Sequence, residues 1–250
     1  MIRSCPYSGS LKAIFLGIYL LIPGILFAPS LRAELSPSTG EHITGIIGKL
    51  KTAYAQVEDY QLETEVKTYH EGKFVEMNRF LYTFKKPDHI RIDMKSPSAG
   101  MILIYPSGDG KVAVKPNGLL GFLKLNLFPD SALLSNATGQ RIDQTDMGLL
   151  IKNIDHSITD RSHRTVSVSE QDGQVRIEVL AEDHFLKGVL TLYHFIIDKT
   201  HWLPVEVREF TPAGILKREV MFRNIRTSIG IPESFFRISG GSLEHGQSGK

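Results

Sequence analysis

The residues best suited to chemistry in this sequence are its histidines and the carboxylates close to them. Three pairs could supply a general acid or base: Asp155 with His156, Asp183 with His184, and Asp198 with His201. No recognisable nucleophile stands near any of them, and the sequence contains no Gly-x-Ser-x-Gly, His-Glu-x-x-His or Walker motif. We therefore interpret the pairs as turn residues at the surface and expect no enzymatic activity.

Metal, cofactor and nucleic-acid sites are not supported either. The spacing of His156, His163, His194 and His201 matches no metal-ligand pattern, and Cys5 is the single cysteine of the chain. The formal net charge is +2, from 29 basic and 27 acidic residues, and no long basic block occurs. A nucleic-acid-binding protein needs a concentrated positive face. We expect no metal, no cofactor and no nucleic-acid partner.

Residues 1–33 have the pattern of a signal peptide. Arg3 and Lys12 precede an apolar stretch from Ala13 to Leu31, and Ala33 offers a small residue for cleavage. An uncleaved membrane anchor is the alternative, because the stretch approaches the roughly 20 apolar residues that span a bilayer. Both interpretations predict that the rest of the chain is exported.

The exported part begins with a helix and continues in strands. Apolar residues recur at helical spacing over residues 41–57, and from Tyr60 the period changes to two. Tyr60, Leu62 and Thr64 are predicted to share one face of the first strand. Further strands with the same alternation are expected at 80–84, 90–94, 101–105, 112–114, 166–168, 175–179, 189–198, 205–210 and 215–225.

The middle of the chain follows neither period cleanly. Residues 117–135 are interpreted as a loop with one or two short helices, and residues 143–158 regain helical spacing. The polar residues 239–250 are expected to be a disordered tail. These patterns predict a mainly β (α+β) domain over residues 34–238, with about ten to eleven strands in a strongly curved antiparallel sheet. Helices must cover its concave face, and the interior is either filled by side chains or left open for an apolar ligand.

Several segments in series resemble the LolA family of periplasmic lipoprotein carriers. The segments run as a strand–turn–strand signature followed by a late group of strands. They are Lys85–Ile92, Ser96-Pro97, Gly108–Gly110, Phe195–Asp198, Leu203–Val207, Phe222–Ile225 and Ile231–Phe236. The resemblance extends over about residues 40–237. Residues 139–151 depart from the carrier proper and are closer to a LolA-like domain of unknown function.

The resemblance implies an incomplete β-barrel with a helical lid and a cavity that accepts acyl chains. The inward strand residues are then candidates for contact with the ligand, with ordinary core packing as the alternative. These candidates are Tyr82, Phe84, Ile90, Ile92, Leu103 and Tyr105.

A glycine-punctuated apolar run is the candidate lid, and the alternative is that it only caps the core. Its residues are Leu119, Leu120, Phe122, Leu123 and Leu125, with Leu127 and Phe128 continuing the run. Arg91 points to the opposite face from its two isoleucine neighbours. The family suggests that Arg91 holds the lid through backbone carbonyls or binds a polar headgroup, and a solvated strand face is the alternative.

The function that follows is non-enzymatic carriage of lipid or lipoprotein acyl chains in the periplasm. A carrier of this kind implies an inner-membrane donor and an outer-membrane acceptor, and a monomer is expected. The alternative is an envelope-stress or signalling scaffold of the same fold that binds a protein partner.

Overall fold

The computed structural model describes residues 37–131, 134, 141–159 and 166–238. All of them belong to the unit formed by residues 33–250, which is separate from residues 1–32. The predicted signal peptide, residues 1–33, and the predicted tail, residues 239–250, lie outside the described residues. In the part of the chain that is described, no helix is both long and apolar enough to cross a bilayer.

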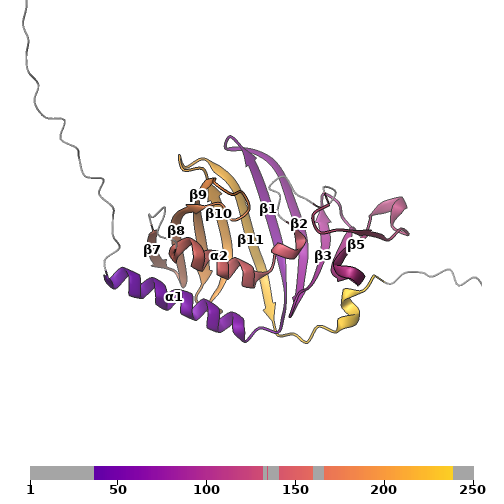
Figure 1. Cartoon of the computed structure of the whole chain (residues 1–250), viewed down its shortest axis with the longest axis horizontal. Helices are drawn as coiled ribbons and strands as arrows, with labels where there is room; N and C mark the ends of the chain where they lie inside the picture. The colour runs from indigo at the N-terminus through magenta and orange to yellow at the C-terminus, as the bar shows by residue number, and fades with distance from the viewer. Residues whose placement is uncertain (1–36, 132–133, 135–140, 160–165, 239–250) are drawn as a thin grey trace, which may run out of the picture. The chain divides into compact units, whose positions relative to one another are not determined.

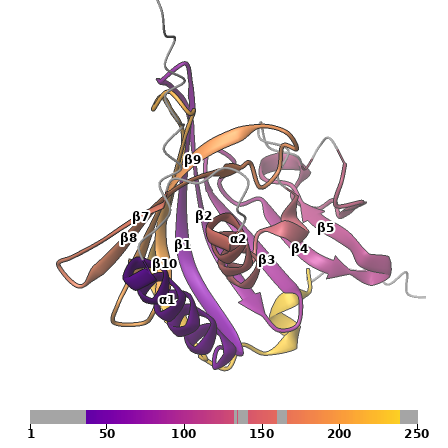
Figure 2. The same ribbon diagram turned by 60° about the vertical axis from the view of Figure 1, so that its left-hand side comes forward.

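Eleven described strands form one antiparallel sheet (Figure 1). In chain order they are β1 Asp59–His70, β2 Lys73–Lys85, β3 His89–Ser96, β4 Ile102–Ser107, β5 Lys111–Lys115, β6 Leu125–Leu127, β7 Val166–Gln171, β8 Gln174–Glu182, β9 Leu190–Asp198, β10 Leu203–Phe210 and β11 Leu216–Thr227. Their order across the sheet is β6-β5-β4-β3-β2-β1-β11-β10-β9-β8-β7. Figure 2 shows the sheet curving around α2, with β5 and β7 far apart on its two sides. The edge strands β6 and β7 do not pair with each other, so the sheet stays open. The predicted fold class is confirmed.

Two α-helices cover the concave face: α1 spans Pro37–Ala55 and α2 spans Met147–Thr159. Four short 3₁₀ helices accompany them: η1 Gly108–Gly110, η2 Gly118–Leu120, η3 Ile142–Gln144 and η4 Glu233–Phe236. Both α-helices were predicted from apolar spacing. The prediction for residues 117–135 missed β6, because three residues are too few for an alternation to be recognised.

The core lies between these helices and the sheet. One face of α1 buries Ile43, Ile46, Ile47 and Leu50, and this helix packs against β10 and α2. Burial of a large aliphatic side chain contributes about 1.5–3 kcal/mol, so packing rather than intrinsic propensity holds the helix. The inward residues of β1 join the same core, as the alternation predicted.

The convex face is polar where the sheet is widest. Lys67 Nζ lies 2.9 Å from Glu219 and 3.3 Å from Glu65, and Arg79 Nε lies 2.7 Å from Glu65. Near β4 and β5 the same face is apolar instead, and the C-terminal segment covers it. Ile231 and Phe236 pack there in a second small cluster of buried residues.

A buried carboxylate fixes that C-terminal segment to the sheet. Asp59, which is 4% exposed, accepts hydrogen bonds from the backbone N–H of Ile229 at 2.7 Å and of Ile231 at 2.8 Å. The carbonyl of Asp59 also accepts the N–H of Ser228 at 2.7 Å. Asp59 therefore joins the start of β1 to the chain that follows β11.

Replacement of Asp59 by alanine is expected to lower the free energy of unfolding by about 2 kcal/mol, because two N–H donors lose their acceptor. Urea unfolding measures the change. The matched control is Glu63→Ala, an exposed position on the same strand, which should change the stability by less than about 0.5 kcal/mol. An equal effect of both substitutions would contradict the anchoring role.

Candidate ligand-binding site

A pocket opens between the concave face of the sheet and α2. Its volume is about 110 Å³. The floor is mostly apolar and comes from the strands at the centre of the sheet. The main floor residues are Leu62, Val66, Phe80, Ile92, Val220 and Phe222. Met147 and Leu150 of α2 line the opposite side, and Phe185 of the β8–β9 loop closes one end.

Two tyrosines on the floor hold the N-terminal end of α2. The Tyr60 hydroxyl accepts the backbone N–H of Met147 at 2.9 Å, and the Tyr82 hydroxyl lies 3.1 Å from Thr145 Oγ1. Burial raises the pKa of both phenols above the ordinary value, so both stay neutral. Asp146 caps the helix by accepting the N–H of Leu149 at 2.9 Å.

A close contact with α1 supports α2 from the outside. A Cβ added at Gly148 would lie 2.5 Å from Tyr54 Cε1, so only glycine lets the ring approach. Lys51 of α1 donates to Asp155 of α2 at 2.7 Å. α1 therefore contacts α2 at its first turn, through Tyr54, and again near its C-terminal end, through Lys51.

The C-terminal end of α2 is tied to the β8–β9 loop. Ser157 Oγ lies 2.8 Å from His184 Nε2, and the His184 ring stacks on Tyr193 with centroids 4.2 Å apart. Burial lowers the pKa of His184 to about 4, although the neighbouring Asp183 opposes the shift. His184 is therefore neutral at pH 7, and this contact completes the attachment of α2.

The β8–β9 loop depends on Asp183. Its Oδ1 accepts the N–H of Phe185 at 3.0 Å and of Leu186 at 3.1 Å, and its Oδ2 accepts from Thr191 Oγ1 at 2.7 Å and Lys217 Nζ at 3.1 Å. Burial raises the pKa of Asp183, but these donors outweigh burial and hold the pKa below its usual value. A charged Asp183 thus fixes the loop that carries His184.

The sequence interpretation of Asp183 and His184 as surface turn residues was wrong. Alternation cannot show that the loop folds back onto α2, and the Ser157 contact joins residues 27 positions apart. The Ser157–His184 pair is nevertheless a poor nucleophile and base. Ser157 is 3% exposed and does not line the pocket, and the oxygens of Asp183 are bound elsewhere.

A buried ion pair in the pocket wall was also missed. Arg218 donates to Glu209 at 2.5 Å, and each residue is 5% exposed. Both stand at inward positions of their strands, where Val207 and Val220 flank them. A charged residue at an inward position of an alternating strand is the signal that could have revealed this pair. It gives the apolar pocket one polar wall.

The structure separates the six predicted cavity residues. Tyr82 and Ile92 line the pocket. Phe84 and Ile90 are fully packed in the core, and Leu103 and Tyr105 are half-buried against it. Contact of these six residues with a ligand stays a prediction.

The five predicted lid residues lie in η2, in β6 and in the residues between them, and none lines the pocket. Leu119, Leu120, Phe122, Leu123 and Leu125 are all exposed. They follow β5, and only the three residues of the edge strand β6 pair back onto it, so the run extends beyond the sheet edge. The elements that cover the pocket in this structure are α2 and the β8–β9 loop. A lid role for residues 119–125 stays a prediction and requires movement of this segment.

Arg91 lies on the convex face, as the alternation predicted. Its Nη1 donates to the backbone carbonyl of Phe235 at 2.8 Å, its Nε donates to Asp93 at 2.9 Å, and its guanidinium lies 4.4 Å from the Phe235 ring. The bond to a backbone carbonyl is of the predicted kind, but the carbonyl belongs to η4. In this structure Arg91 fixes the C-terminal segment, and its role as a lid latch or headgroup ligand stays a prediction.

The described residues define an open antiparallel half-barrel with an apolar pocket under a helix, and they contain no group of three or more side chains suited to a metal ion. No protein-family model matches the chain, and no curated protein matches its sequence.

Solved structures similar to this one share its fold at low identity. An uncharacterised conserved protein from Thermus thermophilus has 7% identity and a TM-score of 0.47 over 80% of this chain and 96% of that chain. A LolA superfamily protein from Nitrosomonas europaea has 10% identity and a TM-score of 0.36 over 78% of this chain and 97% of that chain. The MucA/MucB complex of Pseudomonas aeruginosa has 14% identity and a TM-score of 0.42 over 79% of this chain and 61% of that chain. These similarities identify no ligand for this chain.

Replacement of His184 by glutamine is expected to reduce the acid sensitivity of the fold. Because the pKa of His184 is lowered to about 4 in the folded state, the unfolded chain binds more protons below about pH 6.5, and stability falls as the pH drops. Between pH 6.5 and 5 this group should remove about 1–2 kcal/mol from the unfolding free energy.

Urea unfolding at the two pH values measures this difference. His184→Gln should lose less stability on acidification than the unmodified chain. The exposed His70→Gln should keep the full pH dependence. Equal pH dependence in all three proteins would contradict the burial of a neutral His184.

Proposed function

We propose that this chain binds acyl chains of lipid or lipoprotein in the pocket under α2 and carries them without catalysis. The observation that supports this proposal is an apolar pocket placed between a curved sheet and one tethered helix. Pockets of this kind, apolar with few polar groups, are typical of sites for apolar ligands. The ion pair of Arg218 and Glu209 offers a polar wall for the head of such a ligand.

The size of the pocket requires a movement of α2. A volume of about 110 Å³ is close to that of a cavity that holds benzene, whereas ligand pockets commonly reach about 300–1,000 Å³. Burial of a chain of sixteen carbons contributes about 13 kcal/mol. The hydrogen bonds and the ion pair of α2 contribute about 1 kcal/mol each. Acyl burial therefore exceeds the polar tethers of α2. Its buried side chains Met147, Ile151, Ile154 and Ile158 contribute about 1.5–3 kcal/mol each, so they must keep apolar contacts, including contacts with the ligand, when the helix moves.

The place of action belongs to the same proposal. Residues 1–33 would direct export, and residues 34–238 would act in the periplasm between an inner-membrane donor and an outer-membrane acceptor. The support is the charge and apolar pattern of residues 1–33. Cell fractionation, with sequencing of the mature N-terminus, tests export and cleavage after Ala33.

A scaffold that binds a protein partner is the second function. The observation that favours it is the open sheet, since β6 and β7 each leave one edge unpaired by a described strand. An exposed edge can accept a strand from a partner. Copurification of a peptide or protein without lipid would support this function over acyl carriage.

Replacement of Val220 by phenylalanine is expected to block the pocket. Val220 is half-buried and lines the floor, so a larger side chain there takes up ligand space. Binding of a dansyl-labelled fatty acid, followed by fluorescence, should weaken about tenfold or more. Extraction of the full chain purified without detergent, with native mass spectrometry, should show bound acyl species only in the unmodified protein.

The matched control is Met221→Phe, which adds similar bulk to the next position of β11 on the opposite face. It should bind the labelled fatty acid like the unmodified chain. No binding by the unmodified chain, or equal loss in both variants, would contradict acyl binding in this pocket.

Weakening the tethers of α2 is expected to accelerate ligand entry. The double variant Lys51→Ala/Ser157→Ala removes two side-chain contacts from the C-terminal half of the helix, at Asp155 and Ser157, so the open state becomes more populated. Association of the labelled fatty acid should speed up roughly threefold to tenfold. Amide exchange of residues 147–159 should rise in parallel.

The control is Lys49→Ala on α1. Lys49 Nζ lies 4.4 Å from the centre of the Trp202 ring, between β9 and β10, and this contact does not involve α2. The labelled fatty acid should associate with Lys49→Ala at the same rate as with the unmodified chain. An unchanged rate in the double variant would show that α2 is not the moving element.

A further inference from the structure

The segment that follows β5 exposes an unusual number of large apolar side chains. Leu119 is 94% exposed and Phe122 is 82% exposed. Leu120, Leu123, Leu125 and Phe128 are exposed as well. Residues 119–128 are called the apolar tip below. Isolated exposed apolar residues are ordinary, but a contiguous group of this kind marks an interaction surface.

The charged residues of the apolar tip and of β5, which precedes it, have one sign. Lys111, Lys115 and Lys124 are the only charged residues between positions 111 and 128. Lys111 Nζ lies 5.1 Å from the centre of the Phe128 ring. Glu233 and Arg237 line a groove with Lys124 and offset each other. Asp109 and Asp130 flank this stretch, so the three lysines leave a small positive excess around the tip.

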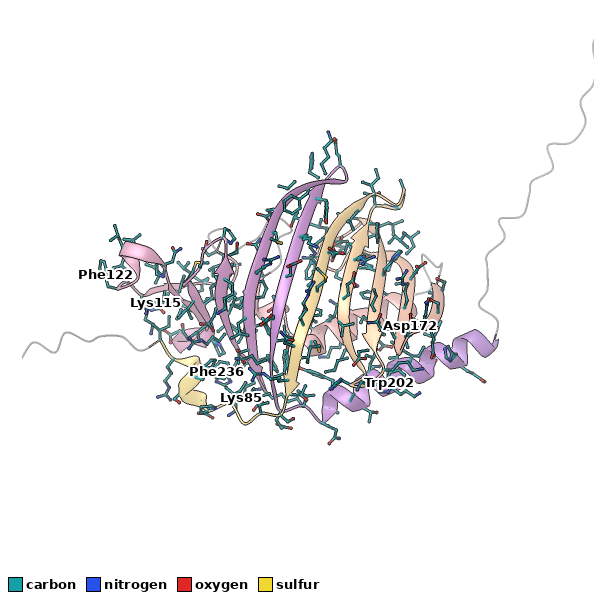
Figure 3. All side chains as sticks on the ribbon, turned by 180° about the vertical axis from the view of Figure 1, so that it is seen from behind. Lys85, Lys115, Phe122, Asp172, Trp202 and Phe236 are labelled. Atoms are coloured by element: carbon teal, nitrogen blue, oxygen red, sulfur yellow. The ribbon has the colours of Figure 1, made fainter. Side chains whose placement is uncertain are left out.

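The apolar tip lies at one outer end of the sheet. Figure 3 shows Phe122 and Lys115 together at the end opposite Asp172 of the β7–β8 turn. β6 pairs with β5 through three residues, Leu125–Leu127, so the residues before it extend past the sheet. This position leaves the tip accessible to a flat partner without any change in the pocket.

We propose that the apolar tip inserts into the surface of a bilayer that contains anionic lipid. Leucine and phenylalanine side chains enter the boundary between headgroups and acyl chains, and lysines beside them contact anionic headgroups. A basic protein surface is not complementary to a second copy of itself, because the same lysines would face one another. The combination of exposed apolar side chains with lysines fits a lipid surface best.

The proposal does not depend on acyl binding in the pocket. The pocket lies under α2 and none of its lining residues belongs to the tip. Membrane contact would bring the protein to the surface that holds its ligand. The blocked variant Val220→Phe should therefore still bind vesicles, which separates failure of this proposal from failure of the proposed function.

Vesicle sedimentation with the full chain tests the proposal. Vesicles of phosphatidylglycerol and phosphatidylethanolamine in equal amounts should sediment the protein, and vesicles of phosphatidylcholine should do so much less. Leu119→Asp/Phe122→Asp should reduce the bound fraction about tenfold or more. Lys115→Glu/Lys124→Glu should weaken binding to the anionic vesicles, as should about 1 M salt, where the Debye length is about 3 Å.

The matched control is Phe74→Asp/Val75→Asp. These residues are each 59% exposed at the β1–β2 hairpin, away from the tip. This variant should sediment like the unmodified chain, and circular dichroism should show that all variants fold. The proposal would be overturned if the unmodified chain did not bind vesicles, or if the control lost as much binding as Leu119→Asp/Phe122→Asp. It would also be overturned if the unmodified chain were a dimer and Leu119→Asp/Phe122→Asp, but not the control, were a monomer.

Discussion

The pairing of β1 with β11 is the interaction on which the rest of the structure depends. It joins two antiparallel series, β1–β6 and β7–β11, into one sheet whose curvature surrounds α2. The registers Val66↔Val220 and Thr64↔Phe222 bring together the floor of the pocket. The same pairing sets the convex ion pairs of Lys67 and Glu219. Without this seam the two halves would have no shared concave face and no pocket.

Much of this fold follows from local pattern, and much of the site does not. Alternation in β1 and the apolar spacing of both helices predict the elements and their buried faces, because both signals lie within a few residues. The pairing of β1 with β11, the Ser157–His184 contact and the bond from Met147 to Tyr60 join distant residues, and periodicity carries no information on such distances. The apolar run at 119–125 shows the limit most clearly. Composition alone cannot show whether this run covers the pocket or is exposed beyond the sheet, since the difference depends on the length and position of the edge strand β6.

The helix α2, which covers the pocket, packs closely against its neighbours and forms few hydrogen bonds and ion pairs with them. Gly148 admits Tyr54, and the hydroxyls of Tyr60 and Tyr82 satisfy the start of α2. These contacts define one position for the helix, yet each contributes little free energy compared with burial of a long acyl chain. A helix held in this way is well placed without being rigidly fixed. The buried pair of Arg218 and Glu209 stays in the floor, so a movement of α2 would leave the polar wall in place.

The seam also sets the order in which the chain can fold. Lys67 and Glu219 are 152 residues apart, so the centre of the sheet is completed by the last described strand in chain order, β11. Until β11 arrives, β1 keeps one edge open and the apolar concave residues lack half of their neighbours. Contacts between such distant residues slow folding and prolong the time for which unpaired strand edges are exposed. The strands that form before β11, beginning with the hairpin β1–β2, therefore leave β1 with one unpaired edge. Aggregation competes with folding until β11 pairs with that edge.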